Sequence, residues 1–344
     1  MKKTVSLLTT LLLTLLLLTG CSGGDTSSDA SAGTGSSAPA SSAAAKKVKI
    51  NVAAIKGPTG VGMANLMKAA DDKTAGNDYA FQVVTDPNEI VGKISNGDVD
   101  IAAVPTNLAA SLYAKTNGKV KMLAVNTLGV LYIMENGETV KAVEDLKGKT
   151  IYSTGQGANP EYVLRYLLTK NGLEPGKDVT IEFLAENEEL NTKLVSGDIS
   201  LALVPEPNVT AVQAQKAELR VALDINDEWN KTAGDDSKLM MGCVIARKEF
   251  IEEHPEAVKA FLNEYKTSIE KASSDLEGTA ALCETYGIIP KAVLAKKAIP
   301  RCNLTYIDGN AMMEQIKGYF DVLFEANPKS LGGALPDESF YFLG

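Results

Sequence analysis

The stretch KISNGDVDIAAVPTNLAASL, residues 93–112, returns in the same pattern as KLVSGDISLALVPEPNVTAV, residues 193–212. Between the two stretches, identical residues stand one hundred positions apart. They are Lys93 and Lys193, Gly97 and Gly197, Asp98 and Asp198, Ala102 and Ala202, Val104 and Val204, and Pro105 and Pro205. A repeat at a fixed offset indicates two units of one architecture. The sequence therefore predicts two halves with the same order of elements.

Each half alternates short runs rich in β-branched residues with segments of helical periodicity. This alternation predicts parallel sheets joined by crossover helices. The expected strands are 48–55, 79–85, 99–104, 150–154, 179–184 and 199–204. Helices are expected to begin near Val61, Asn88, Thr106, Pro160, Glu188 and Pro207. We expect an α/β fold with two Rossmann-like lobes.

The glycine-rich turn after the first expected strand, IKGPTGVGMANLM at 55–67, has a twin in the second half, where Gly157 matches Gly57. In open parallel sheets, ligands bind beyond the carboxyl ends of the strands, where helix N-termini meet. Such a corner follows each of the expected strands that end at 55, 104, 154 and 204. The four corners predict one binding cleft if the lobes face each other. The same residues could instead simply cap helices and turn corners. The candidate ligand-binding residues are Lys56, Gly57, Pro58, Thr59, Gly60, Thr106, Asn107, Thr154, Gly155, Gln156, Gly157, Asn159, Glu206 and Asn208.

The N-terminus predicts export and anchoring. Two lysines precede an apolar run at 7–18, which is too short to span a bilayer and is typical of a secretory signal. The run ends in LTGC, residues 18–21, which resembles the lipobox of bacterial lipoproteins. We expect a signal peptide at 1–20, a lipid (palmitate-type) anchor on Cys21 at the outer face of the cell membrane, and a flexible Ser/Ala/Gly tether at 21–46.

Composition limits the function further. The net charge of −9 argues against a nucleic-acid partner and leaves small molecules open. The one histidine, His254, offers no partner for a catalytic nucleophile, and the spacing of cysteines and acidic residues matches no metal motif. We expect no catalytic residue, no cofactor and no metal. In an oxidising compartment Cys243 could pair with Cys302, or Cys243, Cys283 and Cys302 could be three buried thiols.

Several stretches together resemble the substrate-binding lipoproteins of ABC importers: KGPTGVGMANLM, GDVDIAAVPTNLAASLY, TLGVLYIMENG, DLKGKTIYSTGQGANPEYVLRYLL and VPEPNV. The resemblance covers residues 47–344 and is to the type II periplasmic-binding-protein branch that includes alkanesulfonate, nitrate and thiamine-pyrimidine binders. It implies a two-lobed clamp whose chain crosses a hinge twice. It also implies a monomer that passes a solute to a membrane permease and catalyses nothing.

Extended apolar runs at 126–137 and 239–250 suit the two hinge crossings. They predict a first lobe of 47–140 plus 241–344 and a second lobe of 141–240. A surface sensor or adhesin built on the same clamp is one alternative function. A second alternative is an enzyme related to the pyrimidine synthase of this fold, although the histidine and cysteine-rich segment of that enzyme are absent here.

The sequence favours a nitrogen heterocycle or an amine over a sulfonate as the solute. No arginine falls in the candidate loops, whereas recognition of an anion usually recruits arginine. Glu206 would add a negative charge that suits an amine. Tyr132, Tyr152 and Trp229 are candidates for walls around a ring, or are core residues.

Overall fold

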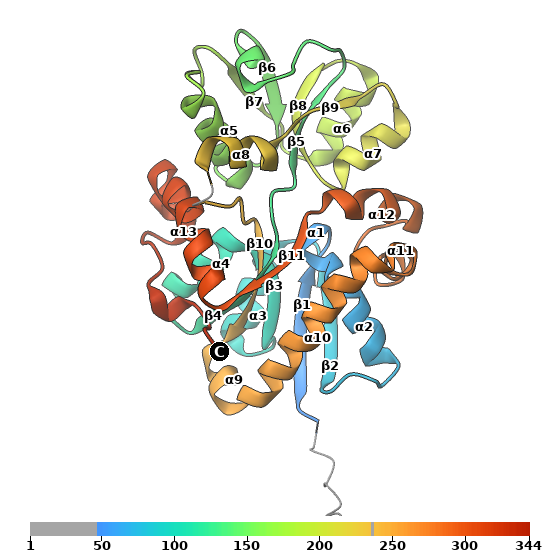
Figure 1. Ribbon diagram of the computed structural model, residues 1–344, viewed down its shortest axis with the longest axis vertical. Helices are drawn as coiled ribbons and strands as arrows, with labels where there is room; N and C mark the ends of the chain where they lie inside the picture. The colour runs from blue at the N-terminus through green and yellow to red at the C-terminus, as the bar shows by residue number, and fades with distance from the viewer. Residues whose placement is uncertain (1–46, 235–236) are drawn as a thin grey trace, which may run out of the picture. The chain divides into compact units, whose positions relative to one another are not determined.

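The computed structural model describes residues 47–234 and 237–344, so the predicted signal peptide, Cys21 and the tether lie outside the described residues. Two sheets organise these residues (Figure 1). The first has the order β11-β4-β10-β3-β1-β2, and the second has the order β7-β6-β8-β5-β9. The first sheet contains β1 Lys49–Ile55, β2 Asp78–Val84, β3 Ile101–Pro105, β4 Val120–Thr127, β10 Gly242–Arg247 and β11 Leu304–Asp308. The second contains β5 Leu131–Glu135, β6 Thr150–Ser153, β7 Thr180–Phe183, β8 Leu201–Pro205 and β9 Arg220–Asp224.

Helices connect and cover the strands. In and after the first repeat they are α1 Pro58–Val61, α2 Ala64–Asp71, α3 Pro87–Asn96 and α4 Thr106–Lys115. In and after the second they are α5 Asn159–Lys170, α6 Asn187–Ser196, α7 Asn208–Gln215 and α8 Ile225–Ala233. The C-terminal segment adds α9 Lys248–Glu253, α10 Pro255–Ser274, α11 Leu276–Thr285, α12 Ala292–Ala298 and α13 Gly309–Ala326. Short 3-10 turns are η1 Val143–Leu146, η2 Ile299–Arg301, η3 Pro328–Leu331 and η4 Glu338–Phe340.

The two sheets confirm the predicted α/β repeat. In each, a central strand pairs in parallel with two neighbours, as β1 does with β2 and β3, and β6 with β7 and β8. In the first sheet β10 is antiparallel to β3 and β4, and β11 is antiparallel to β4; in the second sheet β5 is antiparallel to β8 and β9. The helix predicted near Val61 is divided into α1 and α2 at Gly62 and Met63, and a Cβ at Gly62 would lie 2.9 Å from Ile269 Cγ1.

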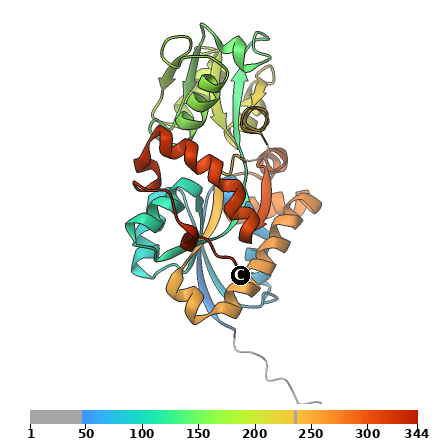
Figure 2. The same cartoon turned by 60° about the vertical axis from the view of Figure 1, so that its left-hand side comes forward.

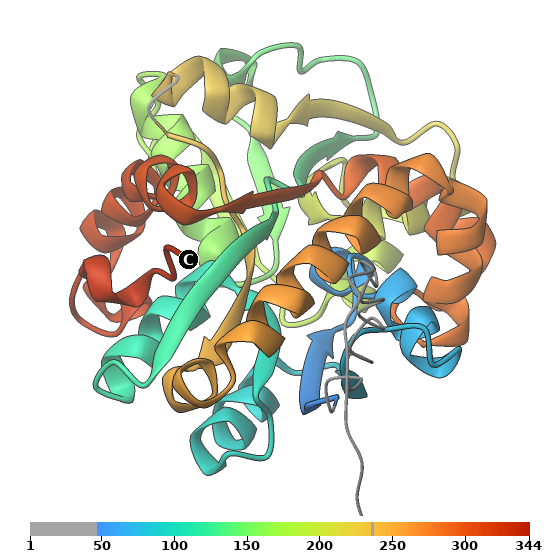
Figure 3. The same ribbon diagram turned by 60° about the horizontal axis from the view of Figure 1, so that its bottom comes forward.

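Alternate strand residues face opposite layers, as the two-residue period of a strand requires. Leu131 and Ile133 of β5 pack with α5 and α8, whereas Tyr132 and Met134 pack with α6 and α7. Figure 1 shows these helix pairs on the two sides of the second sheet. The first sheet is covered on one face by α1, α2 and α10–α12 and on the other by α3, α4 and α13 (Figures 2 and 3).

The chain passes between the sheets at 128–130 and again between β9 and β10. The predicted run at 126–137 is therefore divided: its first two residues end β4, and Leu131–Glu135 belongs to the second sheet. A Cβ at Gly129 would lie 2.7 Å from Leu239 Cδ2, so the two crossing segments touch where only glycine fits. The sheets thus divide the chain about ten residues before the predicted boundary at 140.

The three cysteines among the described residues, Cys243, Cys283 and Cys302, are buried, free thiols, so the Cys243–Cys302 disulfide considered above is not formed. Cys302 Sγ instead donates a hydrogen bond to the Ala298 carbonyl, 3.3 Å away in the preceding turn. Cys243 faces the layer of α4 and α13, whereas Cys283 lies in the other layer with α10. Burial raises the pKa of the Cys283 thiol to about 12, which keeps it protonated.

Candidate functional site

The first candidate corner joins β1 to α1. Gly57 has φ 93° and ψ −159°, a conformation almost restricted to glycine, and its N–H donates to the Ile288 carbonyl at 3.0 Å. A Cβ at Gly60 would lie 2.2 Å from the Ile55 carbonyl oxygen, so this position also excludes a side chain. Pro58 begins the helix, and Lys56 is exposed. The glycines therefore form a tight strand-to-helix turn, which was one of the two predicted roles.

The second corner joins β3 to α4 and rests on β10. Thr106 is fully buried, and its Oγ1 donates to the Met240 carbonyl at 2.7 Å. Its backbone N–H donates to the Met241 carbonyl at 3.1 Å. Asn107 follows as a half-buried residue. Thr106 is thus held by the returning chain and presents Asn107 at the edge of the sheet.

The third corner joins β6 to α5. Gly155 and Gly157 both have positive φ, and the Tyr162 hydroxyl donates to the Gly157 carbonyl at 2.7 Å. Thr154 Oγ1 donates to Asn187 Oδ1 at 2.9 Å, which brings the start of α6 to this corner. Asn159 does not cap α5. Asn159 is the first helical residue, and the cap position, Ala158, has no side-chain oxygen.

The fourth corner joins β8 to α7 and holds a buried carboxylate. Glu206 is 2% exposed and accepts hydrogen bonds from the Thr210 N–H (3.2 Å) and Oγ1 (2.9 Å). Arg301 Nη1 of η2 lies 3.4 Å from Glu206 Oε1 and donates to Gln213 at 2.9 Å. Burial raises the pKa of the Glu206 carboxyl, and its bonds with Thr210 and Arg301 lower it in part. Arg301 was excluded from the candidate loops by its sequence position, and the structure brings it beside Glu206.

The structure brings the corners of the two sheets into contact in two pairs. Asn159 Nδ2 donates to Asn107 Oδ1 at 3.1 Å, which joins the third corner to the second. A Cβ at Gly57 would lie 3.8 Å from Pro207 Cδ, so the first corner lies against the fourth. Asn208 Oδ1 accepts a hydrogen bond from Asn191 Nδ2 at 2.8 Å, and both residues lie in the second half of the repeat. Lys56 and Gln156 are exposed and take no part in these contacts between sheets.

The aromatic candidates have other roles. Trp229 is fully buried and packs on Tyr166 and Tyr319, with ring centroids 4.7 and 5.6 Å away, so it is a core residue and does not line a binding site. The Tyr132 hydroxyl donates to the Arg301 carbonyl at 2.8 Å. Tyr152 is half-buried on β6.

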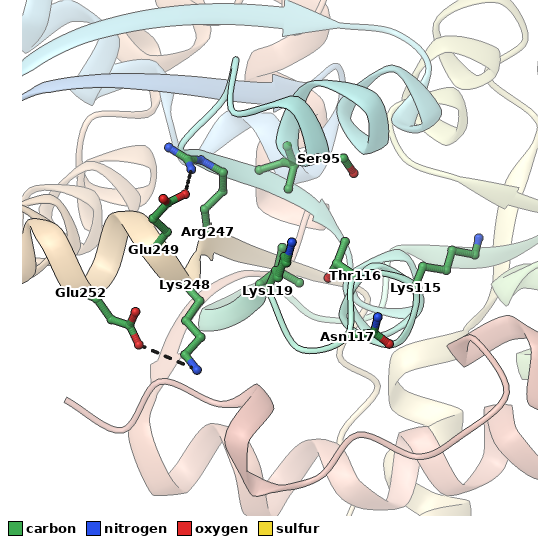
Figure 4. A pocket seen from close by; sticks show the side chains of 11 residues that line it. Ser95, Lys115, Thr116, Asn117, Lys119, Arg247, Lys248, Glu249 and Glu252 are labelled. Carbon is green, nitrogen blue, oxygen red and sulfur yellow. Dashed lines mark hydrogen bonds and ion pairs between the residues drawn. The ribbon is translucent and has the colours of Figure 1, made fainter.

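A cavity of about 630 Å³ lies at the opposite edge of the first sheet, where β3 and β4 begin and β10 ends (Figure 4). Four basic side chains line it, and two of them have acidic partners in the wall: Arg247 bonds Glu249 at 3.0 Å, and Lys248 lies 3.8 Å from Glu252. Because strands of a parallel sheet bind ligands at their carboxyl ends, this cavity is a weaker candidate than the corners.

Two features are absent from the described residues. No three His, Cys, Asp or Glu side chains among residues 47–234 and 237–344 could together hold a metal ion. Within the same ranges, no helix has the length and apolar character needed to cross a membrane.

Two sheets of matched topology, joined by two crossings and with their binding edges in contact, define a periplasmic-binding-protein fold. The family model described as "ABC transporter, phosphonate, periplasmic substrate-binding protein" matches residues 63–288. This is more than half of the chain, and the chain belongs to that family.

Solved structures of similar fold agree with this assignment. A crystal structure of an ABC transporter from Parabacteroides distasonis is 22% identical with a TM-score of 0.72, covering 86% of this chain and 99% of that one. The periplasmic aliphatic sulphonate binding protein SsuA from Escherichia coli is 15% identical with a TM-score of 0.67, covering 86% and 92%. At these identities the likeness shows the fold alone.

Among curated proteins, a candidate binding protein of Brucella abortus is 24% identical over 188 residues, which are 55% of this chain and 56% of that protein. The chain thus spans little more than half the length of this curated relative. The match supports a relationship to binding proteins and does not identify a ligand.

Proposed function

We propose that this protein captures a small solute where the four corners meet and delivers it to the permease of an ABC importer. The observation that carries the proposal is the Asn107–Asn159 contact of 3.1 Å, which joins the binding edges of the two sheets. Neither sheet alone would bring both helix N-termini to one point. Membership in the substrate-binding family supports the same reading.

In this proposal each sheet with its helices is one lobe, and the crossings at 128–130 and between β9 and β10 form the hinge. The hinge is held by side chains from both parts: Asn303 Nδ2 donates to the Gly129 carbonyl at 2.5 Å, and the Gly129 N–H donates to Asn226 Oδ1 at 3.2 Å. Bonds so close to the crossing allow the lobes to rotate about it while the register of the crossing strands is kept.

A lipid anchor would hold the protein close to a permease in the same membrane. We propose that Cys21 carries the lipid anchor and that residues 22–46 are the tether. Replacing Cys21 by Ser should release the protein from the membrane fraction into the extracytoplasmic fluid. Retention of the Cys21→Ser variant on the membrane would contradict the anchor.

The preference for an amine loses its main support. Glu206 was expected to meet a cationic solute, but its carboxylate is bonded by Thr210 and Arg301. A thermal-shift screen of the full chain against phosphonates, sulfonates, amines, nitrogen heterocycles, amino acids and nucleotides tests the binding role directly. A solute at one hundred times its dissociation constant stabilises the folded state by about 2.7 kcal/mol. No shift with any class would contradict the proposed function.

A further inference from the structure

Asn159 carries a buried hydrogen-bond acceptor that no described residue satisfies. The residue is 6% exposed, its Nδ2 donates to Asn107, and its Oδ1 has no partner. Buried polar atoms are nearly always bonded, because an unpaired one has lost water without replacement. An unpaired oxygen at the point where the two sheets touch therefore indicates a group that arrives from outside the chain.

A second amide repeats this arrangement at the neighbouring corner. Asn191 Nδ2 donates to Asn208 at 2.8 Å, and Asn191 Oδ1 is buried without a partner. Asn191 lies one turn after Asn187, whose Oδ1 accepts from Thr154 of the third corner. Asn159 and Asn191 each donate through the side-chain amide N–H to another asparagine, and the amide oxygen of each has no hydrogen-bond partner among the described residues. The unused groups at the two corners are both acceptors.

Resting on the proposed function, we propose that Asn159 Oδ1 accepts a hydrogen bond from the solute and selects solutes that carry a donor. The donor is the hydroxyl of a singly protonated phosphonate or the N–H of an amine. A sulfonate of the same shape and charge has only acceptor oxygens. Placed against Asn159 Oδ1, it would leave two oxygens facing each other and both unpaired.

Matched solutes separate these cases by isothermal titration of the full chain. Methylphosphonate and methanesulfonate have the same shape, and at about pH 5 the phosphonate keeps its hydroxyl, because its second ionisation lies above that of a phosphate monoester, which is near 6. Ethanesulfonate and 2-aminoethanesulfonate differ by one amine. We expect at least about tenfold tighter binding of the donor-bearing member of one pair, because a site that bonds a donor rejects the analogue that lacks it. A preference within the first pair identifies the phosphonate hydroxyl as the donor, and a preference within the second pair identifies the amine.

Variants of α5 connect the preference to Asn159. Asn159→Ala should reduce it to less than about twofold. Asn159→Asp keeps an oxygen acceptor and should retain it, and loss of the preference in Asn159→Asp would contradict a role that needs only an acceptor. The control is Asn171→Ala at the other end of the same helix, where Nδ2 bonds the Leu167 carbonyl at 2.8 Å. It should keep the full preference.

The outcomes are distinct. Equal binding within both pairs overturns the selectivity and leaves the proposed function standing. A preference that survives in Asn159→Ala overturns the role of Asn159. Absence of binding by all four solutes, from folded protein, overturns this inference, whereas the proposed function is overturned only if the thermal-shift screen also shows no stabilisation with any class.

Discussion

The corners after β3 and β8 are the same strand-to-helix turn one hundred residues apart, yet they are held in different ways. Thr106 at the first is neutral and donates to the Met240 carbonyl. Glu206 at the second is a buried acid that requires donors from Thr210 and from Arg301 of the C-terminal segment. The duplicated pattern fixes the turn. The contacts that hold each turn come from the segment that packs beside it, the chain at Met240 for the first turn and Arg301 for the second.

The second half also has a buried aromatic contact with the C-terminal helix. Trp229 packs on Tyr319 of α13, whereas the position one hundred residues earlier is Gly129, where no side chain fits. At this pair of positions, therefore, the first half meets the crossing chain through its backbone, and the second half meets α13 through a large side chain.

Replacing Trp229 by Ala should have the largest effect. The side chain is fully buried between two tyrosines, and truncation of such a residue costs about 3 to 5 kcal/mol of unfolding free energy. Urea unfolding followed by circular dichroism measures the loss. If Trp229 were instead a ligand wall, the variant would lose solute affinity at nearly unchanged stability.

Replacing Arg301 by Met should cost about 1 to 3 kcal/mol at neutral pH, because the Glu206 carboxylate would remain buried with one fewer charged partner. The loss should diminish as the pH falls, since a protonated Glu206 needs no cation. Unfolding curves at several pH values provide the measurement. A pH-independent loss would show that Arg301 contributes only packing.

The pH dependence of Glu206 itself has an unusual sign. Because burial raises its pKa in the folded state, the folded protein binds more protons than the unfolded chain above about pH 4.3. This group therefore lowers stability as the pH rises from the unfolded pKa through the folded pKa. Glu206→Gln should flatten the stability curve in that window, whereas Thr106→Val should leave its slope unchanged.

The twin glycines should differ in their tolerance of a side chain. Gly57→Ala should cost about 1 to 3 kcal/mol, because its backbone lies in a region almost restricted to glycine. Gly157→Ala should cost only about 1 kcal/mol, because Gly157 has φ 72° and no atom lies within 4 Å of an added Cβ. Thermal unfolding of the two variants compares them. Equal losses would mean that the first turn relaxes.

Replacing Thr106 by Val should have the smallest effect, about 1 kcal/mol, from one lost hydrogen bond in a shape that valine preserves. Chemical denaturation quantifies it. A loss much larger than that of Arg301→Met would reverse the comparison between the corners.

The sequence by itself determined the repeated α/β units, the strand-to-helix corners and the long amphipathic helix α10. These depend on periodicity, glycine and proline over short stretches, and the repeat doubled each signal. Val258, Phe261, Leu262, Tyr265 and Ile269 recur at helical spacing along α10, and all five are buried.

Only the tertiary structure decided which corners touch and which residues satisfy them. Arg301 reaches Glu206 across 95 positions, and Asn159 reaches Asn107 across 52, distances at which local pattern carries no information. The same limit applies to the crossing at 128–130, because the apolar run at 126–137 looks continuous in the sequence and is divided only where β5 pairs with β8. Pairing, burial and the partner of each polar atom are set by segments that meet only when the chain is folded.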